Sequence, residues 1–166
     1  MNIPIFKITR IFNAPRDLVW ECWTKAEHIG KWFKPSGFTD NPNFKGKFSF
    51  EVGDYNHYCM VAPDGTEIYG KYTFTEIDPK DKIVYINAFS DAEANLARHP
   101  MAPSWPLELL TTVTFTPDGD QTILNLTWEP INATQKELDT FATSLEGCAQ
   151  GWGGTFENLD RYIGSL

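Results

Sequence analysis

The sequence predicts an α+β fold, in which a curved antiparallel sheet has its apolar face covered by a long C-terminal helix. Three observations support this prediction. Between residues 48 and 128, apolar and polar side chains alternate in short runs that turn sequences separate. From residue 134 to residue 163, apolar side chains recur every three or four positions, as in an amphipathic helix. The first connection alone has a helical pattern, so the later connections are hairpins and not the helical crossovers of a parallel sheet.

The N-terminal part predicts one strand followed by two short helices. Residues 3–12 alternate in a way that suits a strand with one face in water. The sequence Asn13-Ala14-Pro15 then starts a helix, because Pro is favoured in a first helical turn. Thr24 and Glu27 form a T-x-x-E capping box, which predicts a second short helix that ends at residue 32 or 33.

Six further runs predict strands of one antiparallel meander. Turns rich in Pro, Asp and Gly lie at residues 63–65, 78–79 and 117–119. The positions expected to share a face within each run are Phe48 and Phe50; Tyr55, His57, Cys59 and Val61; Tyr72 and Phe74; Ile83 and Tyr85; Leu107, Leu109, Thr111, Val113 and Phe115; and Thr122, Leu124, Leu126 and Trp128.

Two segments follow neither period. Residues 34–44 are rich in Pro, Gly and Asn, which predicts a loop. Residues 88–106 are long and irregular and contain three prolines beside His99, Met101 and Trp105. Long segments of this kind in a compact domain are often lids or binding loops, so we expect residues 88–106 to form a lid.

The last thirty residues predict a single long helix. Thr134 and Glu137 form a second capping box, and an apolar stripe then runs to the end of the chain. Gly151, Gly153 and Gly154 interrupt this pattern, and each costs about 1 kcal/mol in a helix interior relative to Ala. We therefore expect a strand, a loop or a ligand to approach the helix closely at these glycines.

Length, charge and cysteine content limit the function. The 166 residues are enough for one domain, residues 1–166, with a sizeable core. A net charge of −8 and a pI near 4.8 would repel a phosphate backbone, which excludes nucleic acid as a partner. No signal peptide and no apolar run of about 20 residues is evident, so we expect a cytoplasmic protein without a membrane span. Three widely spaced cysteines predict reduced, mostly buried thiols and neither a disulfide framework nor a metal site.

Five segments together resemble the SRPBCC superfamily, which includes START-like and birch-pollen-allergen-like proteins. The segments are FNAPRDLVW at residues 12–20, WT at 23–24, IGKWF at 29–33, PMAPSWPL at 100–107 and GWGGTFENL at 151–159. Within the superfamily, the chain resembles the branch named for the C-terminal domain of the heat-shock protein 90 ATPase activator. This resemblance implies a helix-grip fold, in which the C-terminal helix lies over the curved sheet. It also implies functions as different as lipid carriage, polyketide cyclisation, antibiotic sequestration and chaperone activation.

The aromatic content of 14% exceeds what a core of this size needs, so some rings are expected to face a ligand. The polar groups expected near that ligand are His57, Tyr55, Tyr85, Asn87 and His99. The predicted ligand-binding residues are Phe48, Phe50, His57, Tyr72, Phe74, Tyr85, Met101, Trp105, Val113, Leu126, Trp128, Phe141, Leu145, Cys148 and Trp152. For any one of them, packing in a dry core is the alternative.

The favoured function is therefore binding of a small hydrophobic molecule in a cavity between the sheet and the C-terminal helix. One alternative is an enzyme of the cyclase or hydrolase type that acts on a bound ketone or ester through His57, Tyr85 or His99. Another is a chaperone ATPase activator, ranked third because the activator's N-terminal domain has no counterpart in the sequence. No catalytic residue, metal site or cofactor is predicted. The protein is expected to be a monomer or a weak homodimer that pairs through an edge strand.

Overall fold

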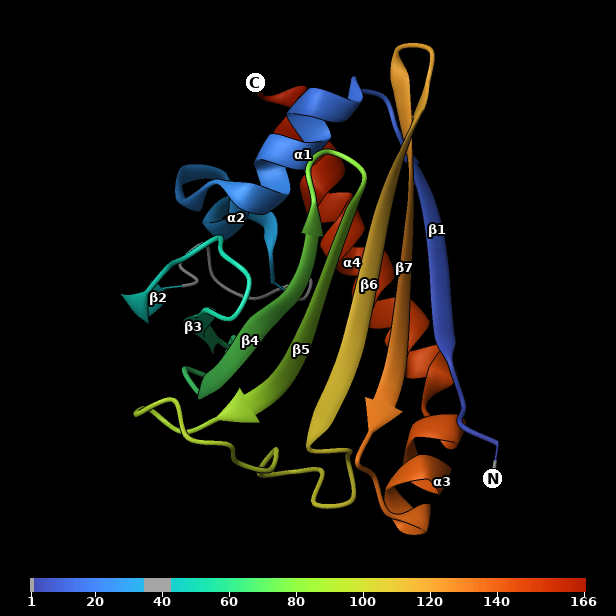
Figure 1. Ribbon diagram of the computed structural model, residues 1–166. Helices are drawn as coiled ribbons and strands as arrows, with labels where there is room; N and C mark the ends of the chain where they lie inside the picture. The colour runs from blue at the N-terminus through green and yellow to red at the C-terminus, as the bar shows by residue number, and fades with distance from the viewer. Residues whose placement is uncertain (1, 35–42) are drawn as a thin grey trace.

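One antiparallel sheet of seven strands is wrapped around the C-terminal helices in the computed structural model, which describes residues 2–34 and 43–166 and, for residues 43–47, the backbone (Figure 1). In chain order the elements are β1 (Phe6–Phe12), α1 (Arg16–Thr24), α2 (Ala26–Trp32), β2 (Asn43–Lys47), β3 (Tyr55–Val61), β4 (Glu67–Asp78), β5 (Lys82–Ser90), β6 (Glu108–Asp118), β7 (Gln121–Ile131), α3 (Gln135–Thr143) and α4 (Leu145–Gly164). The predicted α+β, helix-grip class is confirmed.

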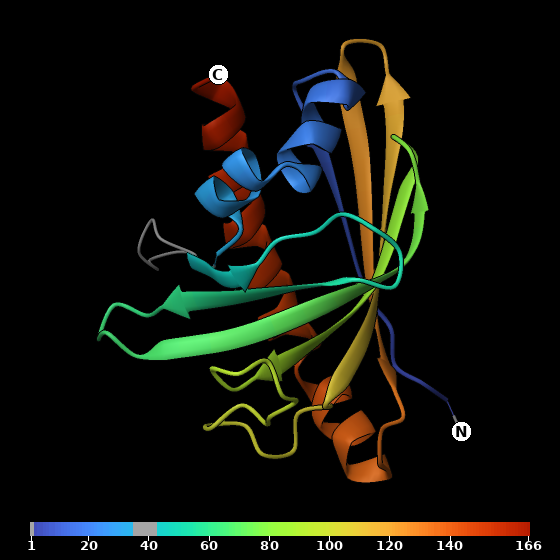
Figure 2. The same ribbon diagram turned by 60° about the vertical axis from the view of Figure 1, so that its left-hand side comes forward.

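The strand order is β1-β7-β6-β5-β4-β3-β2, so the first strand pairs with the last and the others follow as a meander. The register sets Ile8 opposite Leu126 and Leu126 opposite Val113, which aligns the apolar positions of three strands on one face. Figures 1 and 2 show that α4 crosses this face of the sheet and that α1 and α2 lie near the C-terminal end of α4. The inner face is therefore the side on which a site between sheet and helix can form.

Fully buried side chains join the sheet to the helices. Phe12 on β1 and Phe156 on α4 meet edge to face with ring centroids 5.6 Å apart, and both are 0% exposed. Val113 on β6 and Leu126 on β7 are equally buried on the inner face of the sheet. Each such side chain contributes about 1.5–3 kcal/mol by leaving water. This end of the molecule is a packed core.

The second capping box lies where it was predicted, but the first does not form. Thr134 accepts a hydrogen bond from the amide of Glu137, whose side chain accepts one from the amide of Thr134. The hydroxyl of Thr24 instead donates to the carbonyl of Trp20, 2.9 Å away, because Thr24 still belongs to the last turn of α1. The second helix therefore begins at residue 26 without a side-chain cap.

Several predicted strand boundaries were wrong. β1 begins at Phe6 and β6 at Glu108, so residues 3–5 and Leu107 lie outside them. Phe48 and Phe50 follow β2 and lie outside any strand, because the Asn56 side chain bonds both the amide and the carbonyl of Ser49 in place of a neighbouring strand. In contrast, β5 continues to Ser90, so the irregular segment begins at residue 91 and not at residue 88. The loop predicted at residues 34–44 lies mostly outside the described residues.

The expected single C-terminal helix is two helices that meet at Ser144. The hydroxyl groups of Thr143 and Ser144 both donate to the carbonyl of Thr140, at 3.0 and 2.7 Å, and so compete with the helical backbone ladder. Ser144 has φ −105° and ψ 5°, which ends α3 and allows α4 to leave in a new direction. The apolar stripe continued across this break because both helices pack on the same sheet.

The expectation that a strand, a loop or a ligand approaches the helix glycines was wrong for Gly153. A Cβ atom added at Gly151 or Gly153 would meet no heavy atom of the described residues within 4 Å. At Gly151 the open space belongs to a cavity, so approach of a ligand to that glycine stays a prediction.

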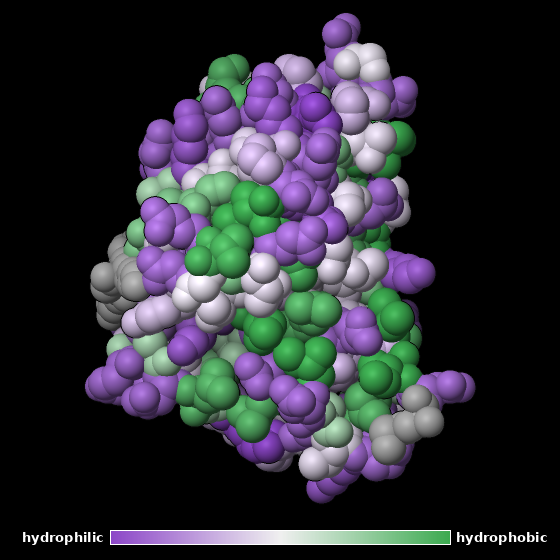
Figure 3. Space-filling view, viewed as in Figure 1, coloured by the Kyte–Doolittle hydropathy of each residue, from purple (hydrophilic) through white to green (hydrophobic). Residues whose placement is uncertain are grey.

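The outer surface is mixed. Viewed from the side of the sheet opposite α4, small apolar groups are separated by hydrophilic residues (Figure 3). None of the described helices has the length and apolar character needed to cross a bilayer.

Candidate ligand-binding cavity

A cavity of about 420 Å³ lies between the inner face of the sheet and α4. Its walls come from β3, β4, β5, β6, β7, the segment 91–107, the end of α2 and one side of α4. The sheet curves away from α4 over β3 and β4, as Figure 2 shows, whereas β1, β7 and β6 stay close to the helices. The packed core thus fills one end of the fold and the cavity occupies the other.

Aromatic rings form most of the cavity wall. Tyr72 on β4 and Tyr85 on β5 lie 5.0 Å apart between ring centroids. Trp128 on β7 meets Trp152 on α4 edge to face at 5.6 Å, and Trp105 lies 6.4 Å from Trp128. These rings hold one another through edge contacts and leave a broad apolar surface toward the cavity.

The wall contributed by α4 is shaped by small residues. Gly147, Cys148, Gly151 and Thr155 line the cavity from successive turns of the helix. The hydroxyl of Thr155 donates to the carbonyl of Lys34, 3.0 Å away, and so fastens the end of α2 to this wall. Burial raises the pKa of the Cys148 thiol to about 11, so this cysteine is a neutral, apolar surface at neutral pH.

Burial also keeps the three cavity tyrosines neutral. It raises the pKa of Tyr58 to about 12 and the pKa values of Tyr72 and Tyr85 further, the nearby tyrosines adding to the effect. Each hydroxyl is therefore a hydrogen-bonding group and not a base near neutral pH.

Polar side chains are few. Besides the hydroxyl groups of the tyrosines, Ser144 and Thr155, the polar lining residues are Asn87 on β5, His99 in segment 91–107 and Lys34, which follows α2. His99 accepts a hydrogen bond from the amide of Met101 at Nδ1, 3.1 Å away, so the neutral ring carries its proton on Nε2. Asp and Glu do not occur among the cavity-lining residues of the described chain, and in the same part of the chain no three His, Cys, Asp or Glu side chains gather as metal ligands.

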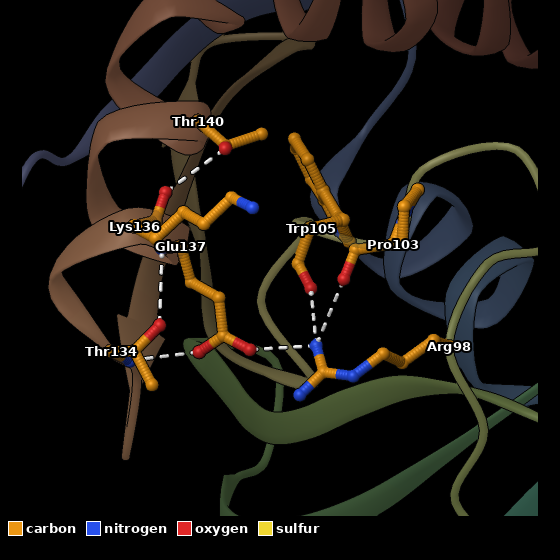
Figure 4. A network of polar contacts seen from close by, with 7 residues as sticks. All are labelled: Arg98, Pro103, Trp105, Thr134, Lys136, Glu137 and Thr140. Atoms are coloured by element: carbon orange, nitrogen blue, oxygen red, sulfur yellow. Dashed lines mark hydrogen bonds and ion pairs between the residues drawn. The ribbon is translucent and has the colours of Figure 1, made fainter.

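Segment 91–107 is fastened to α3 by a charged network, shown in Figure 4. Arg98 donates to the carboxylate of Glu137 at 2.6 Å and to the carbonyls of Pro103 and Trp105 at 3.4 and 3.3 Å. The Trp105 ring packs on Phe141 with centroids 5.4 Å apart and forms part of the cavity wall. The network therefore determines where one wall of the cavity stands.

The structure brings together some of the predicted ligand-binding residues and separates others. Those that line the cavity are Tyr72, Tyr85, Trp105, Trp128, Cys148 and Trp152. Phe74, Val113, Leu126 and Phe141 are buried in the core, and Phe48, Phe50 and Leu145 pack against it. Met101 is 88% exposed.

His57 lies on the other face of β3. Its Nε2 atom is 3.1 Å from the hydroxyl of Ser90 and 3.0 Å from the carbonyl of Asp91, and its ring stacks on Tyr69. Because side chains alternate along a strand, Tyr58 and Met60 point into the cavity instead.

Ligand binding by the cavity residues remains a prediction.

Several lining residues were not foreseen. Phe33, Tyr58, Met60, Ile68, Phe89 and Leu107 belong to this group. The alternation of β3 contained the necessary signal, since Tyr58 and Met60 are the apolar residues of the face opposite His57. The same alternation contained the signal for Ile68 and Phe89, since Ile68 shares a face of β4 with Tyr72 and Phe89 shares a face of β5 with Tyr85.

Comparison with known proteins agrees with the fold. Residues 13–164 match the family described as Activator of Hsp90 ATPase homolog 1-like protein. The chain belongs to this family. The SRPBCC resemblance is thereby confirmed, and none of the curated proteins matches the sequence.

Several solved structures have the same fold and align with almost the whole chain. A solution NMR structure of a protein from Arthrobacter aurescens has a TM-score of 0.79 at 21% sequence identity. The alignment covers 100% of this chain and 92% of the Arthrobacter chain. The crystal structure of Ms6760 from Mycobacterium smegmatis has a TM-score of 0.75 at 17% identity, with 97% and 94% covered. DynU16, a protein of the dynemicin biosynthetic locus, has a TM-score of 0.62 at 18% identity, with 96% of this chain and 46% of its own covered. At these identities the likeness shows the fold alone.

Proposed function

We propose that the protein binds a small, largely apolar molecule in the cavity between the sheet and α4. The observation that carries this proposal is an aromatic cavity of about 420 Å³ inside a fold that is otherwise closely packed. Protein interiors contain few voids larger than a water molecule, so a cavity of this size is not a packing defect. Small-molecule sites measure roughly 300–1,000 Å³ and are mainly apolar.

The composition of the wall favours binding over catalysis in which a carboxylate or a tyrosine acts as the base. The tyrosines stay protonated at neutral pH, and the described lining residues include no carboxylate. Burial of apolar ligand surface, at roughly 25 cal/mol per Å², would supply most of the affinity. The likeness to DynU16, named for the dynemicin biosynthetic locus, agrees with a small-molecule ligand. The three buried free thiols agree with a reducing compartment such as the cytoplasm.

Two glycines on α4 provide a matched test. Gly151 lines the cavity and Gly153 does not, and both have open space where a Cβ atom would stand. Replacing either by Leu removes a helix glycine, but only Gly151→Leu places a side chain at the cavity. We expect wild type and Gly153→Leu to bind the neutral fluorescent probe N-phenyl-1-naphthylamine and Gly151→Leu to lose at least tenfold in affinity, measured by fluorescence titration.

A second variant fills the cavity from deeper inside. Cys148→Trp adds an indole at a buried position of the wall and should abolish probe binding while circular dichroism shows an intact fold. Native mass spectrometry of the freshly purified protein, followed by organic extraction, would identify a ligand that copurifies. Unchanged probe affinity in folded Gly151→Leu and Cys148→Trp would contradict the proposal.

A further inference from the structure

A group of three polar side chains lies in the sheet wall of the cavity. Tyr85 on β5 faces Thr111 on β6 in the strand register, and Asn87 follows two positions along β5 on the same face. The Thr111 hydroxyl, which is 0% exposed, donates to Oδ1 of Asn87, and the Tyr85 hydroxyl is a further polar group on the same side of the sheet.

The hydrogen bond from Thr111 determines what Asn87 offers to a ligand. Thr111 donates its one hydroxyl proton to the Asn87 oxygen. Burial raises the pKa of Tyr85 far above its ordinary value, so the neighbouring phenol stays protonated and does not compete as an anion for that proton. The part of the Asn87 side chain that this bond leaves for the cavity is the amide nitrogen with its two protons.

The hydroxyl groups of the opposite wall do not supply such a donor. The hydroxyl of Ser144 donates to the carbonyl of Thr140 at 2.7 Å, and the hydroxyl of Thr155 donates to main-chain carbonyls at 3.0 Å. Both therefore present lone pairs, not protons, to the cavity. Among the described lining residues, the donors open to a ligand include Nε2 of His99 and the amide of Asn87, and Asn87 is the one whose orientation another side chain holds.

On the basis of the proposed binding function, we propose that the ligand carries a hydrogen-bond acceptor, a carbonyl oxygen of a ketone, ester or amide, and that Nδ2 of Asn87 receives it. Thr111 acts as a positioning residue, because it holds the Asn87 oxygen away from the ligand. An apolar molecule without an acceptor would displace water from the amide protons and leave them unpaired, which lowers its affinity.

Two probes of nearly the same shape test this inference. In 2-acetylnaphthalene a carbonyl oxygen stands where 2-isopropenylnaphthalene has a methylene carbon. The ratio of their affinities is measured by competition against N-phenyl-1-naphthylamine, in wild type and in Asn87→Leu. Differences in the hydration of the probes cancel between the two proteins, so the ratio should fall about tenfold in Asn87→Leu, the effect of one hydrogen bond.

Thr111→Val and Thr112→Val complete the design. Thr111→Val frees the Asn87 amide to rotate and should lower the ratio by a smaller factor, which keeps the inference testable if Asn87→Leu does not fold. Thr112→Val makes the same change on the other face of β6, away from the cavity, and should leave the ratio unchanged.

The outcomes separate the two proposals. If wild type binds both probes and the ratio is the same in Asn87→Leu and Thr111→Val, the acceptor is not recognised at Asn87 and the inference is overturned while cavity binding stands. If wild type binds neither the two probes nor N-phenyl-1-naphthylamine, the proposed function itself fails and this inference fails with it.

Discussion

Glu137 performs two structural tasks with one carboxylate. One oxygen accepts from the amide of Thr134 at 2.8 Å and completes the cap of α3, while the other accepts from Arg98 at 2.6 Å. The main-chain hydrogen bond from Thr134 is the largest cause of the lowered pKa of this carboxyl group, and Arg98 adds to it. The start of α3 and the position of segment 91–107 therefore depend on the same residue.

We expect Glu137→Ala to destabilise the protein by about 1–2 kcal/mol, because it removes a helix cap and leaves the Arg98 guanidinium without its partner. Since the folded-state pKa of Glu137 is lowered, its contribution is present above the ordinary pKa of a glutamate and is lost as the pH falls through the lowered value. The difference between wild type and variant should shrink between pH 7 and pH 3, as measured by urea unfolding.

Asp139→Ala is the matched control, since Asp139 is an exposed carboxylate on the same helix that bonds only Gln135 among the described residues. It should change the free energy of unfolding by less than about 0.5 kcal/mol. An equal loss in both variants would show that the cap and the Arg98 contact contribute nothing specific.

At the scale of single elements, glycines have opposite roles in α4 and β4. The α4 glycines leave open space beside the helix, whereas Gly70 on β4 lies directly beneath the Tyr58 ring. A Cβ atom at Gly70 would stand 2.5 Å from Cζ and Oη of that buried tyrosine. The absence of a side chain at Gly70 is thus required by packing between β3 and β4.

These surroundings predict opposite effects of the same substitution. Gly153→Ala should stabilise the protein by roughly 1 kcal/mol, because alanine loses less backbone entropy in a helix and meets no obstacle. Gly70→Ala should destabilise it by about 1–3 kcal/mol, because the added Cβ atom would overlap the Tyr58 ring, which must give up its present packing. Thermal and urea unfolding of both variants measure this, and a stabilised Gly70→Ala would mean that Tyr58 moves freely.

At the scale of the whole molecule, the cavity tyrosines make the stability of the fold depend on pH in the alkaline range. Tyr58, Tyr72 and Tyr85 lie within ring contact of one another on β3, β4 and β5. Burial raises all three pKa values above the ordinary value of about 10. The neutral phenols therefore stabilise the folded state fully below pH 10, and this contribution is lost as the pH rises through their folded-state values.

Of the six tyrosines, we expect three to resist ionisation in the folded protein until about pH 12, with unfolding accompanying their titration. Absorbance at 295 nm follows phenolate formation, and circular dichroism recorded in parallel follows the fold. Ionisation of all six near pH 10 in a protein that stays folded would contradict the burial of these rings.

The sequence by itself determined the order and type of nearly every element. Turn residues at 63–65 and 117–119 and the period of each run depend on local backbone preferences, which neighbouring residues alone express. The same is true of the cap at Thr134, because its partner Glu137 is three residues away. The sequence pattern gave wrong predictions where a side chain had a second hydrogen-bond partner nearby. The Thr24 hydroxyl bonds the Trp20 carbonyl of its own helix instead of capping α2, and the Ser144 hydroxyl bonds the Thr140 carbonyl where α3 ends.

Only the tertiary structure decided which apolar residues form the core and which line the cavity. Phe74 and Tyr72 share a face of β4, and a two-residue period cannot distinguish them, yet Tyr72 borders the main cavity and Phe74 packs against Phe50. That difference arises from the bend of the sheet relative to α4, which places one end of the strand near the helix and moves the other away. Cavity volume is a property of two surfaces far apart in sequence, so no local pattern in either one encodes it.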